Sequence, residues 1–261
     1  MNKIYGIITI LSSLFCSAQI QNGSIEYGII SHMPIPKNDD GYFSELAKKL
    51  SVSDTLANLS LHFNTKESYF FLNPIILTEF QDTNEFTNIM MVKPKYYTSI
   101  SDSIHKYYEN DPTIGEYAIA AEKKAKWTLT QETKMIGGYL CYKATSPFYN
   151  LETWFDDNHK LDITAWYTTK IPVNFGPNGY HGLPGLILEL QTRMATIYVK
   201  KINLNTTPTP VINKLDSYKL LTIGQRNMLL DKKFSPEMRR FIEDTEKQKN
   251  ETIEKMKAEK K

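Results

Sequence analysis

Histidine, cysteine and acidic side chains are the residues of this chain that could do chemistry. The five histidines are spread along the sequence, and none lies within metal-ligand spacing of another. His159 follows Asp156 and Asp157, but these acids stand in an Asp-Asp-Asn turn, where such residues are expected in any case. Met90 and Met91 offer soft ligands, yet adjacent residues of a strand point to opposite faces. The sequence therefore predicts no metal site and no cofactor.

Cys141 is the candidate nucleophile. A catalytic thiol needs a histidine partner and an accessible, electropositive setting. Cys141 instead lies inside the apolar stretch YLCYKAT, and only the fold could bring His159 or His181 to it. We interpret it as a small buried hydrophobic residue. The chain has no GxSxG elbow, no HExxH and no phosphate-binding glycine loop. Scattered carboxylates between positions 152 and 189 leave a paired-carboxylate hydrolase open, so the sequence leans away from an enzyme without excluding one.

Aromatic side chains gather around one loop rich in glycine and proline, at residues 169–184. Long loops without secondary structure of their own are often functional. This surplus of aromatic rings could line a cavity for an apolar or carbohydrate ligand. The interpretation that we favour is a thick aromatic core, with the loop packed over the end of a sheet. The residues predicted to bind a ligand are Trp154, Trp166, Tyr167, Phe175, Tyr180 and His181.

A turn motif ends this loop. Pro184 presets the second position of a type II turn, and Gly185 supplies the positive φ that the third position requires. We therefore expect Gly185→Val to destabilise the fold. The strand LILEL that follows should direct its leucines into the core. The motif consists of Gly182, Leu183, Pro184 and Gly185.

The stretch AWYTTKIPVNFGPNGYHGLPGLILEL, with the upstream IGGYLCYKAT, resembles the signature of the GLPGLI family of small exported proteins of Bacteroidota. The resemblance covers about residues 130–200, and the run GLPGLILEL is its most specific part. It implies an exported β-rich protein, often encoded near outer-membrane receptors. The family has no established activity and supplies no catalytic residues to carry over.

Alternating apolar residues and turn signals predict a mainly β (α+β) fold. Its core is a curved antiparallel sheet or half-open barrel, partly covered by helical segments. A short helix is expected over 41–50, a helical turn at the Ala-rich end of 104–126, and a tight turn at Gly137-Gly138. The expected strands are 23–31, 59–64, 68–72, 86–92, 95–101, 126–132, 139–146, 151–155, 162–168, 185–191 and 194–204.

The chain divides into a signal peptide at 1–18, a β-rich domain at 19–230 and a charged helical C-terminal extension at 231–261. Ser235-Pro236-Glu237 has the order of residues that a helix start prefers. At the other end, Lys3 precedes an apolar run too short to span a bilayer. Small residues then precede a cleavage site near Ala18-Gln19. We expect a periplasmic or extracellular protein with no transmembrane segment in its mature chain.

The function expected from these features is a non-enzymatic binding or accessory module, for an apolar small molecule or an outer-membrane protein. A net charge of only +2 gives no strong field toward nucleic acid. The alternatives are a hydrolase with a site under the signature loop, and a purely structural interaction protein that uses its C-terminal helix. An empty apolar cavity favours a carrier, convergent catalytic groups favour an enzyme, and a filled core favours an interaction protein.

Overall fold

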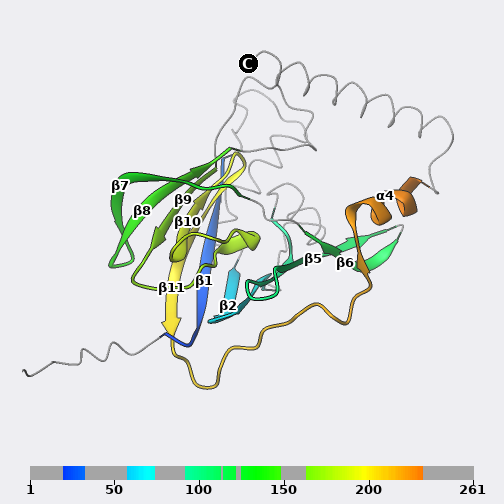
Figure 1. The fold of residues 1–261 in the computed structure, drawn as a ribbon, viewed down its shortest axis with the longest axis horizontal. Coiled ribbons are helices and arrows are strands. Elements are labelled where there is room, and N and C mark those ends of the chain that lie inside the picture. The colour runs from blue at the N-terminus through cyan, green and yellow to red at the C-terminus, as the bar shows by residue number, and fades with distance from the viewer. Residues whose placement is uncertain are drawn as a thin grey trace, which may run out of the picture.

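In the part of the chain that the structure describes, a single curved, open sheet of twelve strands forms the fold (Figure 1). The computed structural model describes residues 20–32, 58–73, 92–112, 114–121, 125–147 and 163–231. The strands are β1 (Asn22–Ser31), β2 (Leu59–Asn64), β3 (Glu67–Leu72), β4 (Lys95–Ser99), β5 (Ile104–Asp111), β6 (Gly115–Ala120), β7 (Thr128–Ile136), β8 (Tyr139–Ser146), β9 (Ile163–Thr168), β10 (Leu186–Gln191), β11 (Ala195–Leu204) and β12 (Leu220–Leu221). Within these ranges the helical elements are the 3-10 turn η1 (Pro177–Gly179) and the helix α4 (Ile223–Asp231).

The first strand lies in the middle of the sheet. β1 pairs with β2 on one side and with β11 on the other. Strands β2 to β6 follow in chain order away from β1, and β10 back to β7 follow beyond β11. All neighbouring strands are antiparallel except β12, which pairs parallel with β6. The predicted curved, mainly β sheet is therefore present, built as two meanders that meet at β1 and β11.

The predicted helical cover is not found among the described residues. The expected helical turn at the Ala-rich end of 104–126 is wrong where it is described, because Gly115–Ala120 forms β6. There Tyr117 and Ile119 alternate with Ala118, and this period of two suits a strand that is buried on both faces. The signal peptide, the helix over 41–50 and the helix start at Ser235 lie outside the described residues. In the part of the chain that is described, no helix is long and apolar enough to cross a membrane.

One face of the sheet, here called the inner face, carries the main core. Leu61, Phe70 and Tyr96 lie directly opposite one another on β2, β3 and β4, and each is at most 1% exposed. Burial of such side chains stabilises a fold by about 1.5–3 kcal/mol each. The same face continues through β1 and β11, where Ile29 pairs with Ile197. A sheet face this apolar must be covered.

A loop between β9 and β10, residues 169–185, covers the inner face and is called the cover loop (Figure 1). Its turn η1 contacts β3 and β4, on the other half of the sheet from the strands that the loop joins. The backbone at Gly179 comes so close to the Tyr96 ring that a side chain there would overlap the ring. Asn178 Oδ1 accepts a hydrogen bond of 2.9 Å from the backbone N–H of Lys93. The cover loop thus ties the two halves of the sheet together.

The turn predicted at the end of the cover loop is wrong in its conformation. Gly182 has a positive φ of 92°, whereas Gly185 does not lie in the positive-φ region that a type II turn requires. Glycine is needed at Gly185 for a different reason. A Cβ there would overlap the backbone carbonyl of Thr168 at the end of β9. The Pro-Gly pair therefore marks a close approach of two backbones, and the chain enters β10 without a type II turn.

We expect Gly185→Ala to lower the free energy of unfolding by about 2 kcal/mol or more, because the new methyl group meets backbone that cannot move aside. The matched control is Gly224→Ala in α4. The nearest atom to a Cβ there is 4.0 Å away, and alanine should stabilise the helix by up to about 1 kcal/mol. Urea unfolding of the three proteins checks this. Equal effects of the two substitutions would contradict the close approach.

Candidate functional site

The predicted ligand-binding residues of the cover loop lie in the core. Phe175, Tyr180 and His181 are all buried. The His181 ring stacks on the His105 ring of β5 at a centroid distance of 4.3 Å. The backbone carbonyl of His181 accepts a hydrogen bond of 2.9 Å from Trp127 Nε1. Burial raises the pKa of Tyr180 above its usual range. These side chains fix the loop to the sheet.

The other predicted residues do not join them in one surface. Trp166 and Tyr167 are neighbours on β9 and therefore point to opposite faces of the sheet. Tyr167 lies opposite Tyr142, on the same face as the buried Ala165, which is the inner face. Trp166 lies on the other face with Lys134, whose Nζ is 4.4 Å from the centre of the ring. Trp154 lies outside the described residues.

Cys141 is a buried residue of β8. Burial raises the pKa of its thiol to about 11, although the nearby Lys134 opposes this shift. The reactive thiolate is therefore disfavoured near neutral pH. In the described ranges, no group of three or more His, Cys, Asp or Glu side chains could hold a metal ion. Neither feature supplies a catalytic centre in the part of the molecule that is described.

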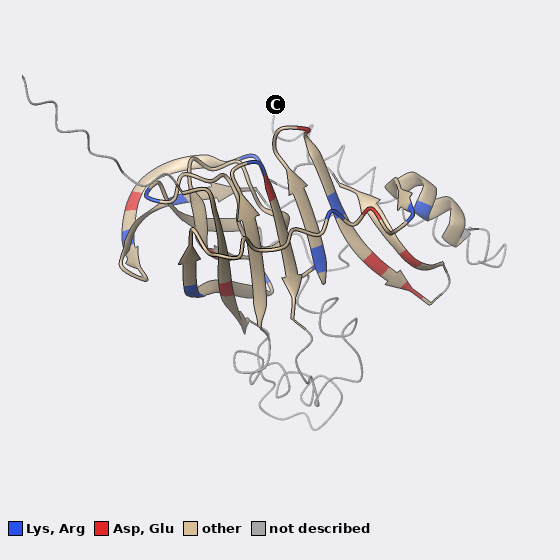
Figure 2. Ribbon diagram, turned by 90° about the horizontal axis from the view of Figure 1, so that it is seen from below, with Lys and Arg blue, Asp and Glu red and all other residues tan. Residues whose placement is uncertain are grey.

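A different site lies on the outer face, the side of β2–β6 opposite the cover loop. After β11 the chain continues as a segment without regular secondary structure, residues 205–219, here called the strap. The strap crosses the outer face and leads to β12 at the edge of the sheet (Figure 1, Figure 2). His62 Nδ1 lies 2.8 Å from the carbonyl oxygen of Val211 at the start of this crossing. The strap therefore covers strands that come more than a hundred residues earlier in the chain. Val211 is 149 residues from His62, and Asp216 is 110 residues from Lys106.

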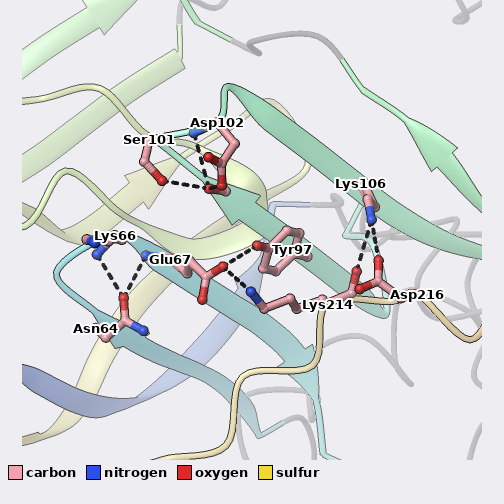
Figure 3. Close-up of polar contacts among 10 residues, drawn as sticks. Asn64, Lys66, Glu67, Tyr97, Ser101, Asp102, Lys106, Lys214 and Asp216 are labelled. Atoms are coloured by element: carbon pink, nitrogen blue, oxygen red, sulfur yellow. Dashed lines mark hydrogen bonds and ion pairs between the residues drawn. The ribbon is translucent and has the colours of Figure 1, made fainter.

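A carboxylate on β3 holds the middle of the strap. Glu67 Oε1 accepts hydrogen bonds of 2.6 Å from both Lys214 Nζ and the Tyr97 hydroxyl (Figure 3). The hydrogen bond from Lys214 has the larger effect and that from Tyr97 the smaller, and together they hold the pKa of Glu67 below its usual value. The Glu67 carboxylate in turn raises the pKa of Lys214. The pKa of Tyr97 is also raised, chiefly because the hydroxyl is buried and in addition because it lies beside the Glu67 carboxylate. The three groups form one charge-assisted junction between strap and sheet.

Two lysines of the sheet hold the strap beyond this point. Lys106 Nζ on β5 lies 2.6 Å from Asp216 Oδ1 (Figure 3). Lys95 Nζ on β4 donates a hydrogen bond of 2.7 Å to the Tyr218 hydroxyl. The same ammonium group lies 4.2 Å from the centre of the Tyr108 ring, which gives a cation–π contact. Acidic and aromatic groups of the strap thus meet cations of the sheet.

Leu215 is the apolar anchor of the strap. Its side chain is 1% exposed and packs with Tyr97, Tyr108 and Ala118 in a cluster separate from the main core. Its φ is 58°, in the left-handed region that costs a non-glycine residue about 1–2 kcal/mol. Asn213 Oδ1 supports this conformation by accepting a hydrogen bond of 2.8 Å from the Leu215 N–H. The surrounding contacts therefore hold Leu215 in a strained conformation.

Local patterns in the sequence do not reveal this site. Lys214, Asp216 and Tyr218 stand in a polar segment after two prolines, which resembles an ordinary surface loop. One available signal was the lone leucine between charged residues. Its burial depends on strands far away in sequence, so no local pattern could identify it.

Comparisons with known proteins bear on the cover loop. A family model described as "Protein of unknown function (Porph_ging)" matches residues 150–189, the stretch that includes β9, the cover loop and most of β10. No curated protein matches the chain. Two structures of PNGF-II, solved in different space groups, are similar at 14% and 13% identity, with TM-scores of 0.49 and 0.48. Each similarity covers 80% of this chain but only 33% of the PNGF-II chain.

We expect the junction at Glu67 to fail in acid. Because the folded pKa of Glu67 is lowered, its stabilising effect is complete above its ordinary pKa of about 4.3 and is lost as the pH falls through the lowered value. Wild type and Glu67→Gln should therefore differ in unfolding free energy at neutral pH and converge in acid. Lys214→Met should behave in the same way. A difference that stays constant down to the acid limit would contradict the assigned junction.

At most positions an alanine variant is more stable than the glycine variant. At Leu215 we expect the glycine variant to be the more stable of the two. Both substitutions remove the buried side chain, but glycine also relieves the left-handed strain, so Leu215→Gly should be the more stable by about 1 kcal/mol. At Leu221 of β12, which is buried in a strand, the alanine variant should be the more stable. Urea unfolding of the four variants checks this. The same order at both positions would show that Leu215 is not strained.

Proposed function

We propose that this chain is a non-enzymatic binding or accessory module of the GLPGLI type that docks a protein partner of the outer membrane. It acts in the periplasm or outside the cell after cleavage near Ala18. The signal-like N-terminus and the motif GLPGLILEL support this assignment. The family match to residues 150–189 falls on the same motif.

The observation that carries the proposal is the occupied inner face. The cover loop places its own buried side chains on that face, where a carrier of apolar molecules would need an open cavity. This favours a protein partner over an apolar small molecule. The chemistry of the described residues also favours binding over catalysis, because the Cys141 thiol is buried with a raised pKa. The surfaces available to a partner are then the outer face and the strand edges.

Native mass spectrometry of the protein purified from its own cell envelope tests this proposal. We expect the mass of the mature chain alone, because the cover loop takes the place of a small ligand. Photo-cross-linking in the intact envelope should then capture a defined protein through outer-face positions. A mass excess that disappears on denaturation and is identified as a lipid or small molecule would make the protein a carrier and reject the proposal.

A further inference from the structure

We propose that the outer face of β3–β6 is a docking surface for a short peptide segment of the partner, and that the chain's own strap occupies this surface in cis. The inference rests on the proposed function as a protein-binding module and deepens it by naming the surface and the chemistry of the partner. It makes the strap an internal competitor that the partner must displace.

The seat of the strap, which is the outer-face surface of β3–β6 that the strap occupies, has the features of a peptide-recognition site. The backbone N–H of Ala118 on β6 donates a hydrogen bond of 3.0 Å to the carbonyl oxygen of Lys219. Leu220 and Leu221 then pair parallel with β6 as the two residues of β12. Leu215, a few residues earlier, fills the small aromatic cluster on the outer face. Addition of a strand supplies affinity through main-chain bonds, and side-chain pockets supply specificity.

The charged groups of this seat define the partner. The sheet presents one carboxylate, Glu67, to Lys214, and one ammonium group, Lys106, to Asp216. Leu215 lies between these two positions of the strap and is buried. The complementary segment therefore carries a basic, an apolar and an acidic residue in succession, so we commit to a partner peptide of that pattern. Such a charge pattern also disfavours a segment that presents the reverse order.

Two features of the strap suit an element that can leave its seat. Leu215 has a φ of 58°, and strained backbone of this kind gathers at ligand clamps and switch regions. The approach to the seat is exposed: Val211 is 78% exposed and Thr209 is also exposed. Apart from the buried Leu215, the strap is held at its middle by the ends of long side chains, which can exchange partners without disturbing the sheet. Release would not require the main core to open, because the cluster around Leu215 is separate from it.

The edge strand β7 is the competing surface, and the geometry favours it less. Leu129, Met135 and Leu140 are exposed on β7 and β8. The pairing of β7 with β8 shifts between Leu129 and Thr133, however, so the strand is irregular along its length. Irregular edges of this kind prevent the addition of a further strand. The outer face of β3–β6 already holds the strap and is the better assignment.

The test uses the mature full-length chain and a fluorescent peptide with the sequence VINKLDSYKLLT of residues 211–222. Leu215→Glu weakens the cis strap by placing a charge in the apolar cluster. A second variant, with Lys214→Glu and Asp216→Lys together, weakens the attachment of the strap through exposed positions. If one variant fails to fold, the other still tests the proposal. Fluorescence anisotropy should show each variant binding the peptide at least about tenfold more tightly than wild type, because removal of a tethered competitor frees the site. A scrambled peptide should not bind.

Exchange of the charges at Lys106 and at peptide position 216 shows whether the peptide binds at the seat of the strap. In the Leu215→Glu variant, added Lys106→Glu should weaken binding of the peptide, and it should restore binding of a peptide that carries Asp216→Lys. Circular dichroism confirms that each protein is folded. Folded variants that bind no peptide, or bind it without response to the exchange, would overturn the inference. If envelope cross-links map the partner to β7 instead, the inference fails while the proposed function stands. A bound small molecule would reject the function independently of the peptide result.

Discussion

The close packing of the cover loop against the inner face is the constraint on which the rest of the structure depends. The two meanders share only the pairing of β1 with β11, and the loop extends from the end of β9 to β3, β4 and β5 in the other meander. Gly179 against Tyr96 and Gly185 against Thr168 leave no room for side chains at the two contacts. The buried Tyr27 hydroxyl adds a third tie by donating a hydrogen bond of 2.7 Å to the carbonyl oxygen of Ile187. A change in the loop therefore affects both halves of the sheet.

This constraint also directs where function can lie. The side chains that looked most like a binding site, Phe175, Tyr180 and His181, serve to hold the loop in place. The strap is attached in a different way. Its ties are charged side chains and one strained apolar residue, Leu215, so its attachment responds to pH and salt and is local. One covering segment is thus part of the core, whereas the other lies on the surface and can be replaced.

Much of the sheet could be predicted from the sequence because its strands alternate cleanly. The segment 139–146 and the turn at Gly137-Gly138 lie where the pattern places them, and both glycines have a positive φ. The pairing of β1 with β11 could not be predicted, since it joins residues such as Ile29 and Ile197 that no local signal relates. The conformation at Gly185 was missed because a Pro-Gly pair has a strong local meaning as a turn, whereas packing against β9 decides it here. The strap was missed for the same reason, because Glu67 and Lys106 give meaning to Lys214 and Asp216 only in the folded molecule.

Native-state hydrogen exchange, followed by mass spectrometry on the full chain, tests the contrast between the two covering segments most directly. The cover loop amides include Tyr180, bonded to Pro177 O, and Gly182, bonded to Asn174 O. We expect them to exchange only through global unfolding, and the amides of residues 212–221 to exchange much faster through local opening. Strap amides that are protected as strongly as those of the cover loop would contradict the account, because the strap would then be a fixed part of the fold.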